Sequence, residues 1–206
     1  MSYQVYKTNL QHTLALLFSI LLSLIFSSEV VAIELGNKGN SVFLSGPIKS
    51  GDQFLFKDFL SANSTIKYVD LNSSGGNIRA AGEIGRQIRE KNLHTIVDGS
   101  RSKCGSSCTI LFASGAQRFY VNGASIKDGV RNKNGLGLGY HEGNDFLADG
   151  KRGQSGAATG HLIGWYYEFG SKAAASLATK ADWKHFYYVS PETAISLGLA
   201  TSTRRY

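Results

Sequence analysis

The chain has only two cysteines in 206 residues, and no second long apolar run follows the one near its amino terminus. Two thiols without nearby partner ligands do not make a metal site, so we expect no metal and no cofactor. Lysine and arginine are scattered and form no stripe interleaved with aromatic residues, which argues against a nucleic-acid groove despite a net charge of +7. Repeats and low-complexity tracts are also missing.

The one apolar run is LALLFSILLSLIF at residues 14–26, preceded by Lys7 and followed by small residues. It is short for a membrane span of about 20 residues. Val30 and Ala32 fit the −3 and −1 positions of a signal-peptidase site, so we expect a signal peptide over residues 1–32. An uncleaved anchor is the alternative. After removal of the leader, no transmembrane segment is expected, and the protein should be exported across the inner membrane, into the periplasm.

Residues 33–206 have the size of one α/β domain. IKYVDL at 66–71 has the β-rich composition of a strand, and residues 77–91 carry apolar side chains at helical spacing. HTIVDG at 94–99 is the next strand, which makes a βαβ unit with a parallel sheet. SVFLSGPI, from residue 41, predicts an earlier strand.

Between residues 123 and 160, glycine becomes frequent and hydrophobic periodicity fades. We interpret this stretch as an inserted glycine-rich loop region around the short segment GLGLGYHEG. Loops this long inside a compact domain usually serve a function or move. Helical patterns return over residues 159–178 and in SPETAISLGLA.

Cys104 and Cys108 stand four residues apart in KCGSSCTILF. In an oxidising compartment, two lone cysteines at this spacing should pair with each other. Unpaired core thiols and a redox pair are the alternatives, and we favour the disulfide. A disulfide across so short a loop would fix the shape of the turn more than it would stabilise the whole chain.

Two turns lead from a strand into a helix, where α/β proteins build sites. Gly75 and Gly76 can aim backbone amides at a developing negative charge, because glycine lets the backbone approach closely. Ser106 is placed at the start of a buried helix, and the amide of Ser107 is a natural second donor. The simpler interpretations are that Gly75-Gly76 is an ordinary turn and that Ser106 caps a helix.

A serine nucleophile needs a base, and the sequence offers five histidines. His141 lies in a short β-like piece that rises from the glycine-rich region. We choose His141 as the base, with His161 as its rival.

The runs VDLNSSGGNIRAAGEIGRQIR and CGSSCTILFASGAQRFYVNGASI resemble the Clp-protease and crotonase-like superfamily. They are most similar to a secreted bacterial ClpP-like branch with a C-x-S-x-C motif. The resemblance covers residues 41–126, touches GYH at His141 and returns in SPETAISLGLA. It implies a single ClpP/crotonase-like domain of stacked ββα units. It also implies assembly as a homo-oligomer.

The resemblance assigns roles residue by residue. Ser106 would be the nucleophile, and the amides of Gly75 and Ser107 would form the oxyanion hole. Ser74 stands where the family has proline. Phe186 stands where the family has its catalytic aspartate, so the orienting acid is open among Asp182, one helical turn away, and Asp145 and Asp149.

Together these patterns predict a secreted serine hydrolase, a peptidase acting on peptide or protein substrates through Ser106 and His141. A non-catalytic envelope protein that uses the fold for binding or assembly is the alternative. An acyl-CoA enzyme of crotonase type is disfavoured, because export removes the chain from the CoA pool.

Overall fold

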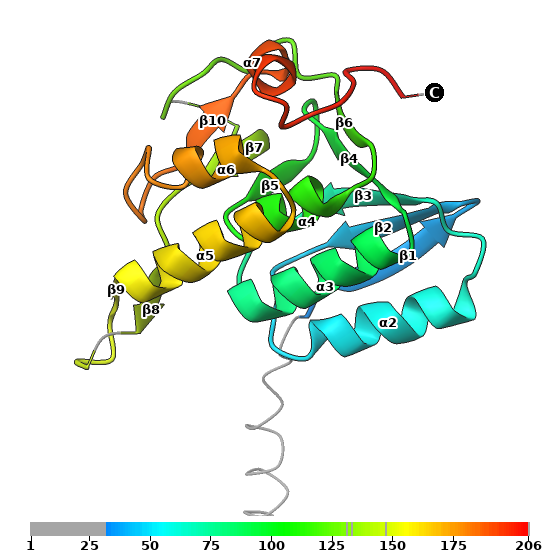
Figure 1. Ribbon diagram of the computed structural model, residues 1–206, viewed down its shortest axis with the longest axis horizontal. Coiled ribbons are helices and arrows are strands. Elements are labelled where there is room, and N and C mark those ends of the chain that lie inside the picture. The colour runs from blue at the N-terminus through cyan, green and yellow to red at the C-terminus, as the bar shows by residue number, and fades with distance from the viewer. Residues whose placement is uncertain (1–31, 131, 133, 147, 206) are drawn as a thin grey trace, which may run out of the picture. The chain divides into compact units, whose positions relative to one another are not determined.

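Four parallel strands form the centre of the molecule, which we describe from a computed structural model (Figure 1). The structure describes residues 32–130, 132, 134–146 and 148–205, and these belong to one compact unit. The predicted signal peptide lies outside the described residues, apart from Ala32. Within the described ranges, no helix has the length and hydrophobicity of a membrane span.

The strands are β1 (Glu34–Lys38), β2 (Ser41–Ser45), β3 (Tyr68–Asn72), β4 (His94–Asp98), β5 (Lys103–Gly105), β6 (Arg118–Val121), β7 (Gly137–Tyr140), β8 (Asn144–Phe146), β9 (Arg152–Gln154) and β10 (Tyr187–Val189). The helices are α2 (Asp52–Ala62), α3 (Ile78–Glu90), α4 (Cys108–Ser114), α5 (Gly156–Glu168), α6 (Lys172–Leu177) and α7 (Pro191–Ser196).

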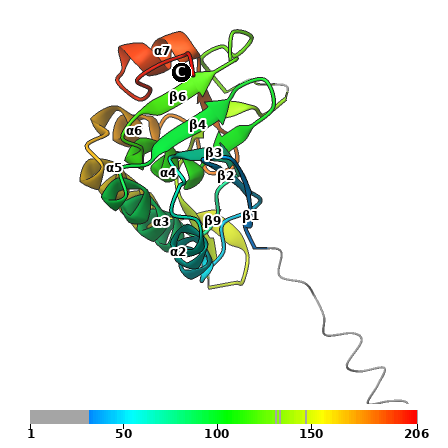
Figure 2. The same cartoon turned by 90° about the vertical axis from the view of Figure 1, so that its right-hand side faces the viewer.

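The main sheet has the order β1-β2-β3-β4-β6, in which only β1 is antiparallel. Helices α2 and α3 pack on one face, as the two views show (Figures 1 and 2). The expected βαβ unit is confirmed as β3, α3 and β4, with β3 and β4 parallel. Helix α3 begins where the Asn77 side chain accepts a hydrogen bond from the Ala80 amide, at 2.8 Å.

A second, smaller sheet has the order β10-β7-β5 and carries the candidate site. Strands β5 and β7 are parallel, and β10 is antiparallel to β7. The bridge between Ser73 and Cys104 joins the end of β3 to β5, which brings the two sheets together. The mixed α/β architecture agrees with the fold class expected from the sequence.

The glycine-rich stretch at residues 123–160 is more ordered than its composition suggested. It contains β7 and the β8-β9 hairpin, and it ends in the first turn of α5. Strand β7 coincides with the short β-like piece expected before His141, although two of its four residues are glycine, which weakens the alternating pattern of side chains by which strands are found.

Candidate functional site

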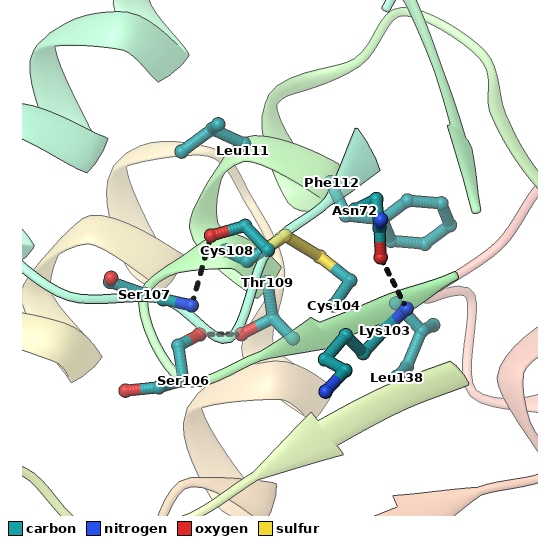
Figure 3. The surroundings of a disulfide bond; sticks show 12 residues. Asn72, Lys103, Cys104, Ser106, Ser107, Cys108, Thr109, Leu111, Phe112 and Leu138 are labelled. Atoms are coloured by element: carbon teal, nitrogen blue, oxygen red, sulfur yellow. Dashed lines mark hydrogen bonds between the residues drawn. A yellow bond between two sulfur atoms is a disulfide. The ribbon is translucent and has the colours of Figure 1, made fainter. Parts of the chain in front are cut away.

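Ser106 lies on a sharp turn between the end of β5 and the start of α4 and is partly exposed. Its φ is +53°, in the left-handed region that serine seldom adopts. The Ser106 amide donates to the carbonyl of Gly139 at 3.0 Å. The Thr109 hydroxyl donates to the Ser106 carbonyl at 2.6 Å (Figure 3). Left-handed backbone at a residue other than glycine costs about 1–3 kcal/mol and persists where its surroundings enforce it, often at functional sites.

Cys104 and Cys108 form the expected disulfide, which spans the Ser106 turn (Figure 3). Both cysteines are fully buried, so the bond lies beneath the turn and not on the surface. Pairing excludes the alternatives of unpaired core thiols and a reduced redox pair in this structure. The disulfide joins the strand before the serine to the first residue of the helix after it, and it therefore holds both arms of the turn.

The Gly75-Gly76 turn lies directly against Ser106. A Cβ at Gly75 would lie 2.6 Å from the Gly105 carbonyl oxygen and 2.8 Å from the Ser106 Cβ. Gly75 has a φ of +91°. Only glycine fits both the conformation and the space. The two strand-to-helix turns that the sequence singled out are therefore in contact.

Hydrogen bonds differ among the three amides closest to Ser106. The Gly75 amide donates to the Ser73 hydroxyl at 3.1 Å, and the Gly76 amide donates to the Ser107 hydroxyl at 2.8 Å. Within the described residues, the Ser107 amide has no hydrogen-bond acceptor. Ser107 and Gly75 are both buried, so a ligand oxygen reaches either amide only after the turn moves, and the Gly75 amide must also exchange the Ser73 hydroxyl.

His141 directly follows β7, two residues after the Gly139 carbonyl that binds Ser106. Its side chain is buried, with 5% of the residue exposed, and the Nδ1 atom has no hydrogen-bond partner in the described part of the chain. Burial lowers the pKa of His141, while a hydrogen bond to the Trp183 backbone and the charge of Asp182 act in the opposite direction. The imidazole is thus neutral near pH 7, as a general base must be. No hydrogen bond joins it to Ser106 in this structure.

Phe186 occupies the position beside His141. The pairing of Tyr187 with Tyr140 places the preceding residue, Phe186, opposite His141, and the two rings meet edge to face with centroids 4.6 Å apart. The phenyl ring also lies on Gly105 and Gly139, where a Cβ would come within 2.9 Å and 3.2 Å of it. An apolar ring therefore fills the space in which a carboxylate could orient the imidazole.

The candidate acids form other contacts. The Asp182 carboxylate accepts from the Lys184 amide and lies 2.9 Å from His185 Nδ1, and the hydrogen bond to His185 is the main cause of its lowered pKa. Asp145 accepts from the Phe146 amide in β8, and Asp149 accepts from the Lys151 amide. None of the three hydrogen-bonds His141. His161 is exposed on α5.

Two cavities of 290 and 280 Å³ lie away from these residues. Both are lined by Asp70, Ile96, Asp98 and Arg101, on strands β3 and β4 and the turn after β4. Neither includes Ser106 or His141.

Neither the protein-family models nor the curated proteins contain a match to this sequence. Among solved structures, it is similar to a serine-to-alanine mutant of the 1510-N membrane-bound stomatin-specific protease, with a TM-score of 0.56 and 14% identity. That match covers 81% of this chain and 78% of the other. A lysine-to-alanine mutant of the same protease, in complex with a substrate peptide, gives a TM-score of 0.57 and 13% identity over 81% and 74% of the two chains. Identities this low speak to the fold alone, so this chain shares the mixed α/β fold of that protease.

Proposed function

We propose that this chain is an exported, periplasmic serine hydrolase of a secreted ClpP-like branch, acting as a peptidase on peptide or protein substrates. Ser106 is the nucleophile and His141 is the base. The amides of Ser107 and Gly75 hold the oxyanion. The family resemblance further suggests that the protein works as a homo-oligomer. The observation that carries the proposal is the left-handed backbone of Ser106, held on a disulfide-bridged turn against Gly75.

The Ser106 turn supports nucleophilic attack because it presents the hydroxyl at a partly exposed corner. Within the described residues, the Ser106 hydroxyl makes no hydrogen bond, so nothing in the protein competes for it. The Ser107 amide directly follows the nucleophile and has no acceptor within the described residues, and substrate binding must expose it because Ser107 is fully buried. A single oxyanion donor typically contributes about 3 kcal/mol to transition-state stabilisation.

In the proposed reaction, the Ser106 oxygen attacks the substrate carbonyl carbon while His141 takes the hydroxyl proton. The negative charge on the carbonyl oxygen is received by the Ser107 amide and by the Gly75 amide, which releases the Ser73 hydroxyl. His141 then returns the proton to the leaving amine, which leaves an acyl group on Ser106. Water, activated by the same imidazole, hydrolyses this ester.

His141 acts in this scheme without a carboxylate partner. Phe186 supplies a low-dielectric wall beside the ring, and burial keeps the imidazole neutral. Hydrogen bonds between catalytic groups are often long in free enzymes and shorten when substrate binds. We therefore assign the alignment of His141 with Ser106 to the substrate-bound state.

Labelling with a fluorophosphonate probe tests the proposal. Oxidised, folded protein should be labelled on Ser106, and Ser106→Ala should abolish the signal. Ser125→Ala is the matched control, because Ser125 is exposed on a loop outside the site and its loss should leave labelling unchanged. The absence of Ser106-dependent labelling in folded, oxidised protein would refute the hydrolase.

A non-catalytic envelope protein is the second candidate. It is favoured by one observation, which is that Phe186 lies beside His141 where the carboxylate is expected, and no hydrogen bond joins His141 to Ser106. Such a protein should not react with the probe at any serine, yet it should keep the fold after Ser106→Ala. Labelling that requires both Ser106 and His141 would exclude this candidate.

A further inference from the structure

We propose that cleavage of the Ala32–Ile33 bond creates an α-ammonium group that the buried carboxylate of Asp52 binds, and that this ion pair braces the segment that holds the Gly75 turn. The ion pair depends on the expected export signal and is independent of the hydrolase function. Only its effect on the site rests on the proposed function.

The Asp52 carboxylate is the starting observation. Asp52 is the first residue of α2 and only 1% of it is exposed. Its Oδ2 atom accepts hydrogen bonds from the Lys49 amide at 2.6 Å and from the Ile33 amide at 3.3 Å. Within the described residues, it has no cationic partner. A buried charge is costly unless it is paired, so this carboxylate lacks the partner that its burial calls for.

Ile33 supplies that partner once the chain is cut. The sequence places the signal-peptidase bond directly before Ile33, after the small residues Val30 and Ala32. Hydrolysis adds one water molecule across this bond, so Ala32 leaves as a carboxylate and the nitrogen of Ile33 becomes an ammonium. That nitrogen already points at the Asp52 carboxylate, and Ile33 is packed in the core with 6% exposed. Cleavage thus replaces a long amide-to-carboxylate hydrogen bond with one in which the donor is charged as well as the acceptor.

Asp52 is also connected to the candidate site. Its carboxylate binds the Lys49 amide, and the preceding residue, Ile48, is clamped to the glycine turn from both sides. The Ile48 amide donates to the Gly75 carbonyl at 2.9 Å, and the Ile48 carbonyl accepts from the Asn77 amide at 2.8 Å. Fixing Lys49 therefore fixes the backbone against which Gly75 is held. In this arrangement Asp52 is a positioning residue and not a catalytic one.

The mature amino terminus is the first test. Intact-mass analysis of the exported protein should give a chain that begins at Ile33. A chain that begins at another residue, or an uncleaved chain, would overturn the proposal, because the ammonium would then lie away from Asp52.

A thermodynamic cycle is the second test. Chains that begin at Ile33 or at Ala32 are released from an amino-terminal fusion by a protease that leaves no extra residue, each with and without Asp52→Asn. Beginning at Ala32 restores the neutral amide seen here, and it should lower the folding equilibrium constant about ten-fold when Asp52 is present. In the Asp52→Asn background, the two chains should be equally stable. An equal cost in both backgrounds would overturn the proposal.

Asp58→Asn is the matched control, because Asp58 lies on the same helix and is exposed. It should leave the ten-fold difference unchanged.

If Asp52→Asn does not fold, acylation of the amino terminus by an N-hydroxysuccinimide ester replaces the cycle. The amine of the Ile33 chain should react at least ten-fold more slowly than that of the Ala32 chain, and equal rates would contradict the ion pair. Slower fluorophosphonate labelling of the Ala32 chain would connect the pair to Ser106. Equal labelling of the two chains would overturn that connection alone.

Discussion

Ser106 and His141 lie on neighbouring segments of the small sheet, but they are held in different ways. The Ser106 backbone is fixed by a disulfide beneath it, by hydrogen bonds to Gly139 and Thr109, and by contact with Gly75. The His141 ring is placed by burial, by a hydrogen bond to the Trp183 backbone and by the edge-to-face contact with Phe186, and its Nδ1 atom has no partner within the described residues. The nucleophile is thus preorganised by many contacts, whereas the base is held by fewer and is not hydrogen-bonded to Ser106.

The largest expected effect on stability comes from disturbing the Ser106 turn at Gly75. Gly75→Ala forces a Cβ against the Gly105 carbonyl at a φ of +91°, and we expect a loss of about 3 kcal/mol in the free energy of unfolding. Urea denaturation measures it. Gly160→Ala is the control, since Gly160 is exposed in α5 with open space around it, and this change should stabilise the protein by about 1 kcal/mol. A Gly75→Ala protein as stable as wild type would show that the turn is not rigid.

Reduction of the disulfide should have the next largest effect. The closed loop is short, so the unfolded-state entropy argument gives about 2 kcal/mol. The double variant Cys104→Ala/Cys108→Ala should lose the same amount in urea denaturation, and dithiothreitol should not change it further. Ser106 labelling should slow in parallel, because the turn loses its brace. Unchanged stability on reduction would mean that hydrogen bonds alone hold the turn.

Acid should lower the stability of the protein through His141. Because burial lowers the pKa of His141 in the folded state, the unfolded chain binds more protons as the pH falls below about 6.5. The free energy of unfolding should therefore decrease from pH 7 to pH 5 through this group. His141→Asn should remove that contribution, whereas the exposed His161→Asn should retain it.

Phe186→Asp sharpens the same comparison. A carboxylate opposite the imidazole should raise the pKa of His141, so the acid-induced loss of stability should shrink even though the variant loses the packing of the phenyl ring on Gly105 and Gly139. NMR titration of the imidazole protons measures the pKa. A pKa that stays low would place the new carboxylate out of contact with His141.

The smallest expected effect tests whether the left-handed backbone of Ser106 is strained. Ser106→Gly should increase the free energy of unfolding by about 0.5–1 kcal/mol, because glycine adopts a φ of +53° without penalty. Ser106→Ala should give no such gain, and neither variant should react with the fluorophosphonate probe. A destabilised Ser106→Gly protein would mean that the hydroxyl itself supports the turn.

Sequence patterns located the parts of this fold that have strong periodicity. The βαβ unit around α3 was predictable because apolar residues recur on one helical face, and six residues of this helix are buried. Strand β1 was missed, since ELGNK is polar, mostly exposed and paired only at the sheet edge. Strand β5 was also missed, because KCG is three residues long and lies within what looked like a turn.

For the site, sequence located the two turns but not their contact or the surroundings of the base. The proximity of Gly75 and Ser106 depends on the bridge between Ser73 and Cys104, a tertiary pairing without a sequence signal. The contact between Phe186 and His141 depends on the register of β10 against β7, which a single sequence cannot fix. Asp182 was a candidate partner of His141, but its carboxylate lies 2.9 Å from Nδ1 of the neighbouring His185 instead.

The position of the Phe186 ring on Gly105 and Gly139 offers an observable that requires no substrate. An aromatic ring shifts the NMR signals of protons above its face, and glycine amides resonate in a sparsely populated region of the spectrum. The α-proton and amide signals of these two glycines should therefore be displaced by ring current in the free protein. Any peptide that moves Phe186 on binding would change them together, so compound libraries could be screened for ligands of the site before the reaction is known.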